Sequence, residues 1–175
     1  NDITIPELTN NPIRTVCYVT GMKYYKEQSL DKALGYFKEA LGNNPSKNID
    51  NVAIYLLIGN IYSSKDEDTN ALEAFNQAIA TDPTEFRSYC NRGVIFKSLG
   101  RFEEAEQDFM KALELNKNDA VTYMNWGNLH RQKEQYSLAL QNYDKALEIN
   151  PQYADALVNK GLVYWLLGKP DEAIK

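Results

Sequence analysis

The sequence predicts an all-α solenoid, in which antiparallel helix pairs stack along the chain. The first observation is a fixed period: Gly59, Gly93, Gly127 and Gly161 stand 34 residues apart, and Gly21 precedes Gly59 by 38. A period of this size is the signature of a repeat array. The second observation is that apolar residues recur at spacings of three and four within each period, as they do along one face of a helix.

Each period contains signals for two helices and a turn. Gly127 and Ala139 are small residues, which lets two helices of one unit approach closely. Gly100 and Gly168 suit the left-handed residue that follows a helix end, and Pro170 suits the first turn of the next helix. The apolar stripe of one second helix consists of Tyr136, Ala139, Leu140, Tyr143, Ala146 and Leu147.

These signals place the helices in order along the chain. No single pair can bury its apolar face alone, so stacking on neighbouring pairs makes one continuous core. The predicted helices cover residues 13–26, 30–42, 52–64, 69–80, 86–98, 102–115, 120–133, 136–149, 154–167 and 170–175.

The pattern of large and small residues resembles the tetratricopeptide repeat. In residues 120–153 it consists of Tyr123, Trp126, Gly127, His130, Ala139, Tyr143, Ala146 and Pro151. The resemblance implies a right-handed superhelix with a concave groove that binds protein or peptide. It divides the chain into an N-terminal extension (1–13), a first repeat with a four-residue insertion (14–51), three further repeats (52–85, 86–119 and 120–153) and a partial fifth (154–175).

The composition of the chain argues against several classes of function. A formal charge of −5 argues against nonspecific binding of nucleic acid, and no apolar run is long enough to span a bilayer. Cys17, Cys90 and the single histidine, His130, make no metal set. We therefore predict no enzyme, no catalytic residue, no metal and no cofactor. A chain that starts at Asn1 and stops inside a predicted helix looks like a piece of a longer polypeptide, and reducing cytosol is the default compartment.

Two irregular segments interrupt the period. Residues 47–50 are an insertion between the first and second repeats. Residues 65–69 form an acidic turn, where we expect Asp68 or Thr69 to cap the following helix rather than to bind calcium.

In the resembled family the first helix of each repeat lines the groove, and we assign groove positions by matching columns. One column holds Asn91, Asn125 and Asn159, and an amide in each repeat can grip the backbone of an extended peptide. This column resembles the asparagine ladder of O-linked N-acetylglucosamine transferases, although Val19 and Leu57 interrupt it. The alternative is that these amides satisfy neighbouring backbone groups or water. The predicted peptide-binding residues are Asn60, Asn91, Asn125, Asn128, Asn159, Arg87, Lys97, Arg131, Tyr18 and Met22.

The groove columns are more basic than the chain as a whole. Arg87, Lys97 and Arg131 favour acidic ligand residues, unless they are simply solvated. Tyr18 and Met22 provide an apolar anchor, unless the N-terminal segment covers them. The lysines and arginine of the carboxylate clamp found in chaperone-binding repeats are missing, so that binding mode is not expected.

The sequence thus favours a protein- or peptide-binding scaffold. The alternatives are a non-catalytic arm of a larger enzyme, such as a glycosyltransferase, and a self-association module. The last would use Trp165 and Leu166, which lack a neighbour at the C-terminal end.

Overall fold

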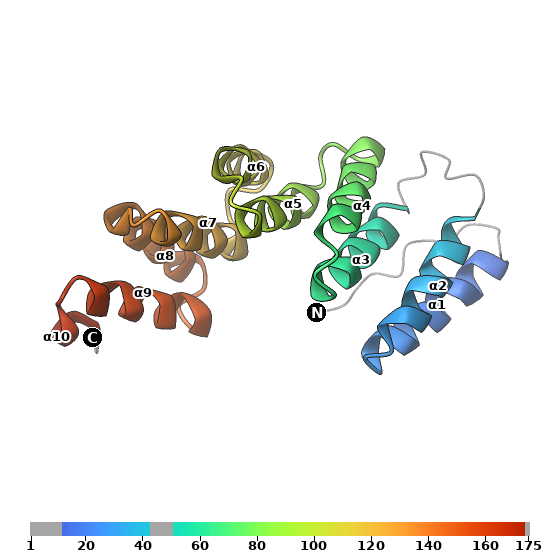
Figure 1. The fold of residues 1–175 in the computed structure, drawn as a ribbon, viewed down its shortest axis with the longest axis horizontal. Coiled ribbons are helices and arrows are strands. Elements are labelled where there is room, and N and C mark those ends of the chain that lie inside the picture. The colour runs from blue at the N-terminus through green and yellow to red at the C-terminus, as the bar shows by residue number, and fades with distance from the viewer. Residues whose placement is uncertain (1–11, 43–50, 174–175) are drawn as a thin grey trace. The chain divides into compact units, whose positions relative to one another are not determined.

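A computed structural model describes residues 12–42 and 51–173, and every element in them is an α-helix (Figure 1). The helices α1 to α9 begin and end within one residue of the predicted ranges. The predicted all-α repeat solenoid is confirmed. The insertion at 47–50 and most of the N-terminal extension lie outside the described residues. The helices are α1 (Pro12–Lys26), α2 (Leu30–Leu41), α3 (Asn51–Ser64), α4 (Asp68–Thr81), α5 (Phe86–Ser98), α6 (Phe102–Leu115), α7 (Ala120–Gln132), α8 (Tyr136–Ile149), α9 (Ala154–Leu166) and α10 (Pro170–Ala173).

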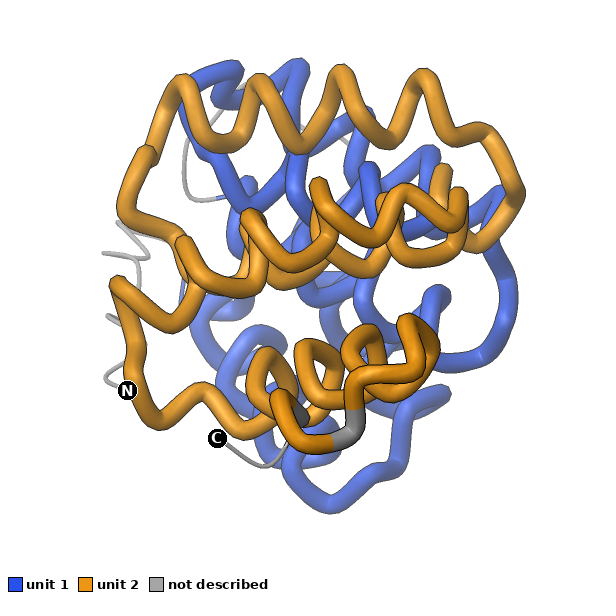
Figure 2. Tube along the Cα trace, turned by 90° about the vertical axis from the view of Figure 1, so that its left-hand side faces the viewer, with its two compact units in different colours: residues 1–95 blue, residues 96–175 orange. Residues whose placement is uncertain are grey.

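The chain forms two compact units, Asn1–Ile95 and Phe96–Lys175, which Figure 2 colours separately. The boundary falls inside α5. In the first unit α1 packs on α2, α2 on α3, and α3 on α4. In the second unit α6 packs on α7, α7 on α8, and both α7 and α8 contact α9.

A glycine of the first helix faces an aromatic ring of the second helix in each complete pair that lies within one unit. A Cβ atom on Gly127 would lie 2.5 Å from Cε1 of Tyr143, and one on Gly21 would lie 2.7 Å from Cε1 of Phe37. Gly59 meets Phe75 in the same way. Glycine recurs at this position of the repeat because the two helices of a pair approach too closely there to leave room for a side chain.

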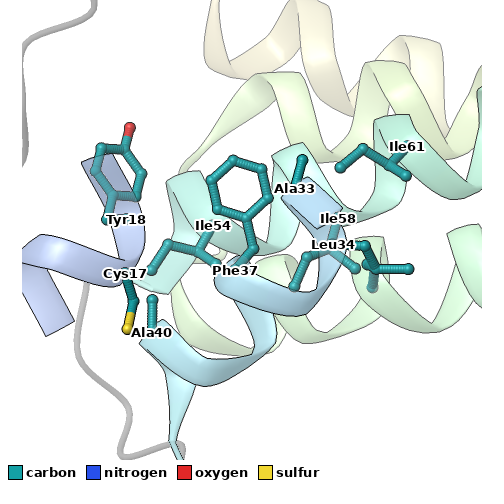
Figure 3. Close-up of a cluster of buried hydrophobic side chains, with 10 residues drawn as sticks. Cys17, Tyr18, Ala33, Leu34, Phe37, Ala40, Ile54, Ile58 and Ile61 are labelled. Atoms are coloured by element: carbon teal, nitrogen blue, oxygen red, sulfur yellow. The ribbon is translucent and has the colours of Figure 1, made fainter. Parts of the chain in front are cut away.

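The same rings join one helix pair to the next. Phe37 of α2 shares a buried cluster with Ile54 and Ile61 of α3 (Figure 3). Tyr143 of α8 likewise shares a cluster with Val163 of α9. Each ring is fully buried, so it closes its own pair and seals the contact with the following pair.

The turns between paired helices contain one residue in the left-handed region. Gly100 and Gly168 have φ angles of 72° and 70°, as the sequence predicts. Gln28, Asp66 and Glu134 hold the matching positions, with φ angles of 57–59°.

The predicted cap of α4 is wrong. Glu67 is the N-cap residue and makes no side-chain cap hydrogen bond, so neither Asp68 nor Thr69 caps the helix. The Glu67 carboxylate instead accepts from Nδ2 of Asn70 at 2.8 Å and lies 3.2 Å from Nζ of Lys65. Since the left-handed Asp66 completes the turn, the chain enters α4 one residue earlier than expected.

We expect Gly127→Ala to lower the free energy of unfolding by about 1–3 kcal/mol, because the added methyl group would collide with the Tyr143 ring. Gly35→Ala is the matched control. Gly35 lies inside α2, and a Cβ there would meet nothing within 4 Å. That substitution should raise stability by about 0.5–1 kcal/mol through helix propensity alone. Urea denaturation followed by circular dichroism measures both, and equal effects of the two substitutions would contradict the packing role of Gly127.

Candidate binding surface

Two of the predicted amides contact one another in the first unit. Nδ2 of Asn91 on α5 donates to Oδ1 of Asn60 on α3 at 3.1 Å. Each amide keeps further hydrogen-bonding capacity, because a carboxamide has two N–H donors and an oxygen that accepts twice. Asn91 and Asn60 therefore bridge consecutive first helices, and their role in binding a peptide backbone stays a prediction.

Arg87, also predicted to contact ligand, is occupied by its own neighbour. Its Nε and Nη2 atoms donate to the two carboxylate oxygens of Glu85 at 2.8 and 2.7 Å. Burial acts to raise the pKa of Glu85, but the hydrogen bonds and charge of Arg87 outweigh it and hold that pKa below its ordinary value. A bidentate pair of this kind leaves Arg87 with little charge to offer a ligand.

The predicted apolar anchor lies largely inside the first unit. Tyr18 is buried, with its ring centroid 6.1 Å from that of Phe37. Its hydroxyl makes no hydrogen bond, and burial raises its pKa. Met22 is half-buried and packs against the same core. Both side chains therefore support the helix pair, and their role as a ligand anchor stays a prediction.

A polar cluster occupies the second unit, where α7 meets α8. The Tyr143 ring passes Gly127 and its hydroxyl donates to Oδ1 of Asn128 at 2.7 Å. Nδ2 of Asn128 points to the Met124 sulfur at 3.0 Å, which is a weak acceptor. Burial raises the pKa of Tyr143, and the side-chain hydrogen bond and charge of the Arg131 guanidinium partly offset that rise. Asn128, Arg131 and Tyr143 thus lie together, and we call them the Tyr143 cluster.

Arg131 has no acidic partner in the described part of the chain. It is half-buried, and its Nε atom is cut off from solvent without a hydrogen-bond acceptor. None of the ion pairs formed by residues 12–42 and 51–173 includes it. Unlike Arg87, this predicted ligand-binding cation is therefore not neutralised by a neighbouring carboxylate.

The remaining predicted residues lie on α7 and α9 of the second unit and near the end of α5. Asn125 on α7, Asn159 on α9 and Lys97 on α5 are all half-buried. Asn91 lies in the first unit whereas Asn125 and Asn159 lie in the second, so the ladder as a whole stays a prediction.

Apolar side chains are exposed beside these polar groups on α7 and α9. Val158 and Trp165 are 70% and 66% exposed, and Val121 is 46% exposed. Val158, Leu162 and Trp165 recur at helical spacing, which places them on one face of α9. We call the surface made by both sets the α7–α9 face: Val121, Met124, Asn125, Asn128, Arg131, Val158, Asn159, Leu162 and Trp165.

Other polar side chains hold the helix pairs together. Arg92 of α5 donates to Oδ1 of Asn76 at 2.7 Å, and Lys160 of α9 pairs with Asp144 of α8 at 2.7 Å. His130 is buried and stacks on Trp126 with ring centroids 5.8 Å apart.

Family models match most of the repeated region. A model described as TPR repeat matches residues 59–100 and 127–168, and one described as tetratricopeptide repeat matches residues 86–119. The chain is made of tetratricopeptide repeats. Repeats of this family generally act as scaffolds for protein interaction. The comparisons give no support to the resemblance to glycosyltransferase ladders, and no curated protein matches the chain by sequence.

Solved structures share the fold over nearly the whole chain. The crystal structure of MamA is 25% identical, with a TM-score of 0.72 and 88% of each chain covered. That of PilW, a type IV pilus biogenesis factor, is 23% identical, with a TM-score of 0.82, and the match covers 94% of this chain and 76% of PilW. A tetratricopeptide repeat protein from Parabacteroides merdae is 22% identical, with a TM-score of 0.78 and coverages of 94% and 63%. The last two likenesses show the fold alone.

The described residues contain no group of three or more histidine, cysteine, aspartate or glutamate side chains placed to hold a metal ion. None of their helices combines the length and apolar character needed to cross a membrane.

Sequence reasoning named Asn128 and Arg131 as ligand contacts but missed Tyr143, although a signal for it was present. Phe37, Phe75 and Phe109 occupy the matching position in the first three repeats, and only Tyr143 adds a hydroxyl. The interpretation treated this column as core. A fully buried hydroxyl needs a hydrogen-bond partner, and the column comparison shows where to look for it.

We expect Tyr143→Phe to lower the free energy of unfolding by about 1 kcal/mol, because the Asn128 carbonyl loses its donor. Asn128→Leu introduces the residue that stands at the matching position of α9, Leu162. The double variant should cost less than the sum of the two single variants by about 1 kcal/mol, since an apolar pair leaves no unpaired group. Tyr143→Phe combined with Asn159→Ala is the control, for which the effects should add. An additive first cycle would show that the hydroxyl and the amide are not coupled.

Proposed function

We propose that the chain is a protein-binding scaffold that holds an extended segment of a partner against its first helices. The observation that carries this proposal is the α7–α9 face, where exposed apolar side chains stand beside polar groups. Val158 and Trp165 are the most exposed large apolar residues on this face. Burial of such side chains under a partner is a source of binding free energy.

Amides along the first helices support the binding of a backbone rather than of one particular sequence. Asn159 is half-buried, and its side chain makes no hydrogen bond within the described chain. Asn91 uses one donor on Asn60 and keeps another. Amides can donate to the carbonyl groups and accept from the N–H groups of an extended segment.

In this proposal the conformation of the scaffold changes little when a partner binds. Rings such as Tyr143, held between a glycine and the next helix pair, fix the spacing of α7 and α9. A surface held in place before binding loses little conformational entropy when a partner docks.

The proposal is tested by capture of partner proteins from cell extract on the immobilised chain. We expect Val158→Glu to reduce capture of the specifically retained proteins by about tenfold or more, because a charge replaces a buried apolar contact. The matched control is Met110→Glu. Met110 is 55% exposed on α6, a second helix of the same unit, and its substitution should leave capture unchanged. Equal loss with both variants, or no loss with either, would reject the α7–α9 face as the binding surface.

Self-association is a second candidate, which the exposure of Trp165, Leu166 and Leu167 at the end of α9 favours. If this apolar run pairs with another copy, light scattering should give a mass above that of the monomer. Trp165→Glu should then restore the monomer mass, while Met110→Glu should not. A monomeric wild-type chain at high concentration would reject this candidate and leave partner binding intact.

A further inference from the structure

We infer that the Tyr143 cluster is a carboxylate-binding site, which selects partner segments that carry an aspartate or glutamate side chain next to a large apolar residue. This inference rests on the proposed function and names the ligand class for it. The proposed site lies in one repeat, residues 120–153, and on the exposed face of α9, the helix that follows this repeat.

The cluster is specific to this repeat. Where Tyr143 stands, the first three repeats have phenylalanine, which cannot hydrogen-bond to the preceding helix. The Tyr143 hydroxyl holds Oδ1 of Asn128, so the amide is oriented with its N–H groups pointing elsewhere. One N–H meets only the Met124 sulfur, and the cluster therefore presents an amide donor that still lacks a strong acceptor.

Arg131 supplies the charge. A guanidinium offers five N–H donors in a planar fork that matches the two oxygens of a carboxylate. Its Nε atom is buried without an acceptor and the guanidinium hydrogen-bonds to the Tyr143 side chain, so a ligand carboxylate would bind the remaining terminal N–H groups. At Arg87 the matching donors are already used, because the Glu85 carboxylate accepts from both Nε and Nη2.

The neighbouring helix determines what accompanies the carboxylate. Repeats that stack in register place matching positions side by side, and α7 contacts α9. The position matching Arg131 is Trp165, and the position matching Asn128 is Leu162. Both side chains are exposed, so a segment whose carboxylate reaches Arg131 can cover them with an apolar residue. Because apolar side chains also flank the cluster on α7, we assign the carboxylate to a side chain within a segment rather than to a chain end.

The experiment measures fluorescence polarisation of labelled short peptides with the full chain. The peptides have a Gly-Ser backbone and an amidated C-terminus, with one Glu and one Phe at every short spacing and in both orders. Matched peptides carry Gln in place of Glu, or Ala in place of Phe. A further set ends in a free carboxylate and has no Glu. We expect the best Glu–Phe peptide to bind at least about tenfold more tightly than its Gln counterpart, and added salt to weaken it.

Variants assign the preference to the cluster. Arg131→Gln should abolish the Glu-over-Gln preference. Arg101→Gln is the control, because it removes an arginine of the same unit that is already paired with Glu104. Tyr143→Phe installs the residue of the first three repeats, so the fold should persist while the preference falls by about threefold to tenfold. Trp165→Ala should reduce the Phe-over-Ala preference and leave the Glu preference in place.

The outcomes separate this inference from the proposed function. If peptides bind but Glu and Gln are equivalent, or if the preference survives Arg131→Gln, the carboxylate site is rejected while segment binding stands. If only the free-carboxylate set binds, the assignment to a side chain is rejected. If no peptide binds to the folded wild-type chain at any spacing, both the carboxylate site and the binding of extended segments are rejected.

Discussion

The contact between a glycine and an aromatic ring organises this molecule. At Gly21, Gly59 and Gly127 the ring of the second helix lies where a side chain would otherwise stand. The same ring then packs on an apolar residue of the next pair, as Tyr143 does on Val163. One side chain therefore sets both the spacing within a pair and the spacing between pairs. Because each contact involves only neighbours, the chain builds its core locally, repeat by repeat.

The same arrangement accommodates a polar cluster without disturbing the fold. At Gly21, Gly59 and Gly127 the ring edge, up to its Cζ atom, lies against the glycine of the first helix. In three repeats the ring is phenylalanine, and at Tyr143 a hydroxyl on the Cζ atom meets Asn128. A single oxygen atom thus converts a packing contact into an ordered polar group beside Arg131. The scaffold tolerates the change because the ring keeps its shape and its burial.

The fold was predictable from the sequence because its signals are local and repeated. Helices α1 to α9 match the predicted ranges within one residue, since apolar spacing, glycines and prolines mark each end. The cap of α4 was predicted wrongly, because the choice among Glu67, Asp68 and Thr69 depends on the turn that Asp66 makes. For the candidate site, the sequence predicted only which residues stand at matching positions of successive first helices. Column membership could not show that Arg87 is paired with a carboxylate, that of Glu85, while Arg131 forms no ion pair within the described residues, since both stand on first helices.

The sequence by itself determined the repeat, the helices and the family, because these depend on residue type and spacing along the chain. It also determined which residues stand at matching positions of successive helices. Only the tertiary structure decided which of those side chains are already hydrogen-bonded: Asn91 to Asn60, Arg87 to Glu85, and Asn128 to Tyr143. The physical reason is that a side chain's partners come from other helices and turns, at distances set by packing, and a difference of one rotamer separates a satisfied group from one that can bind a ligand.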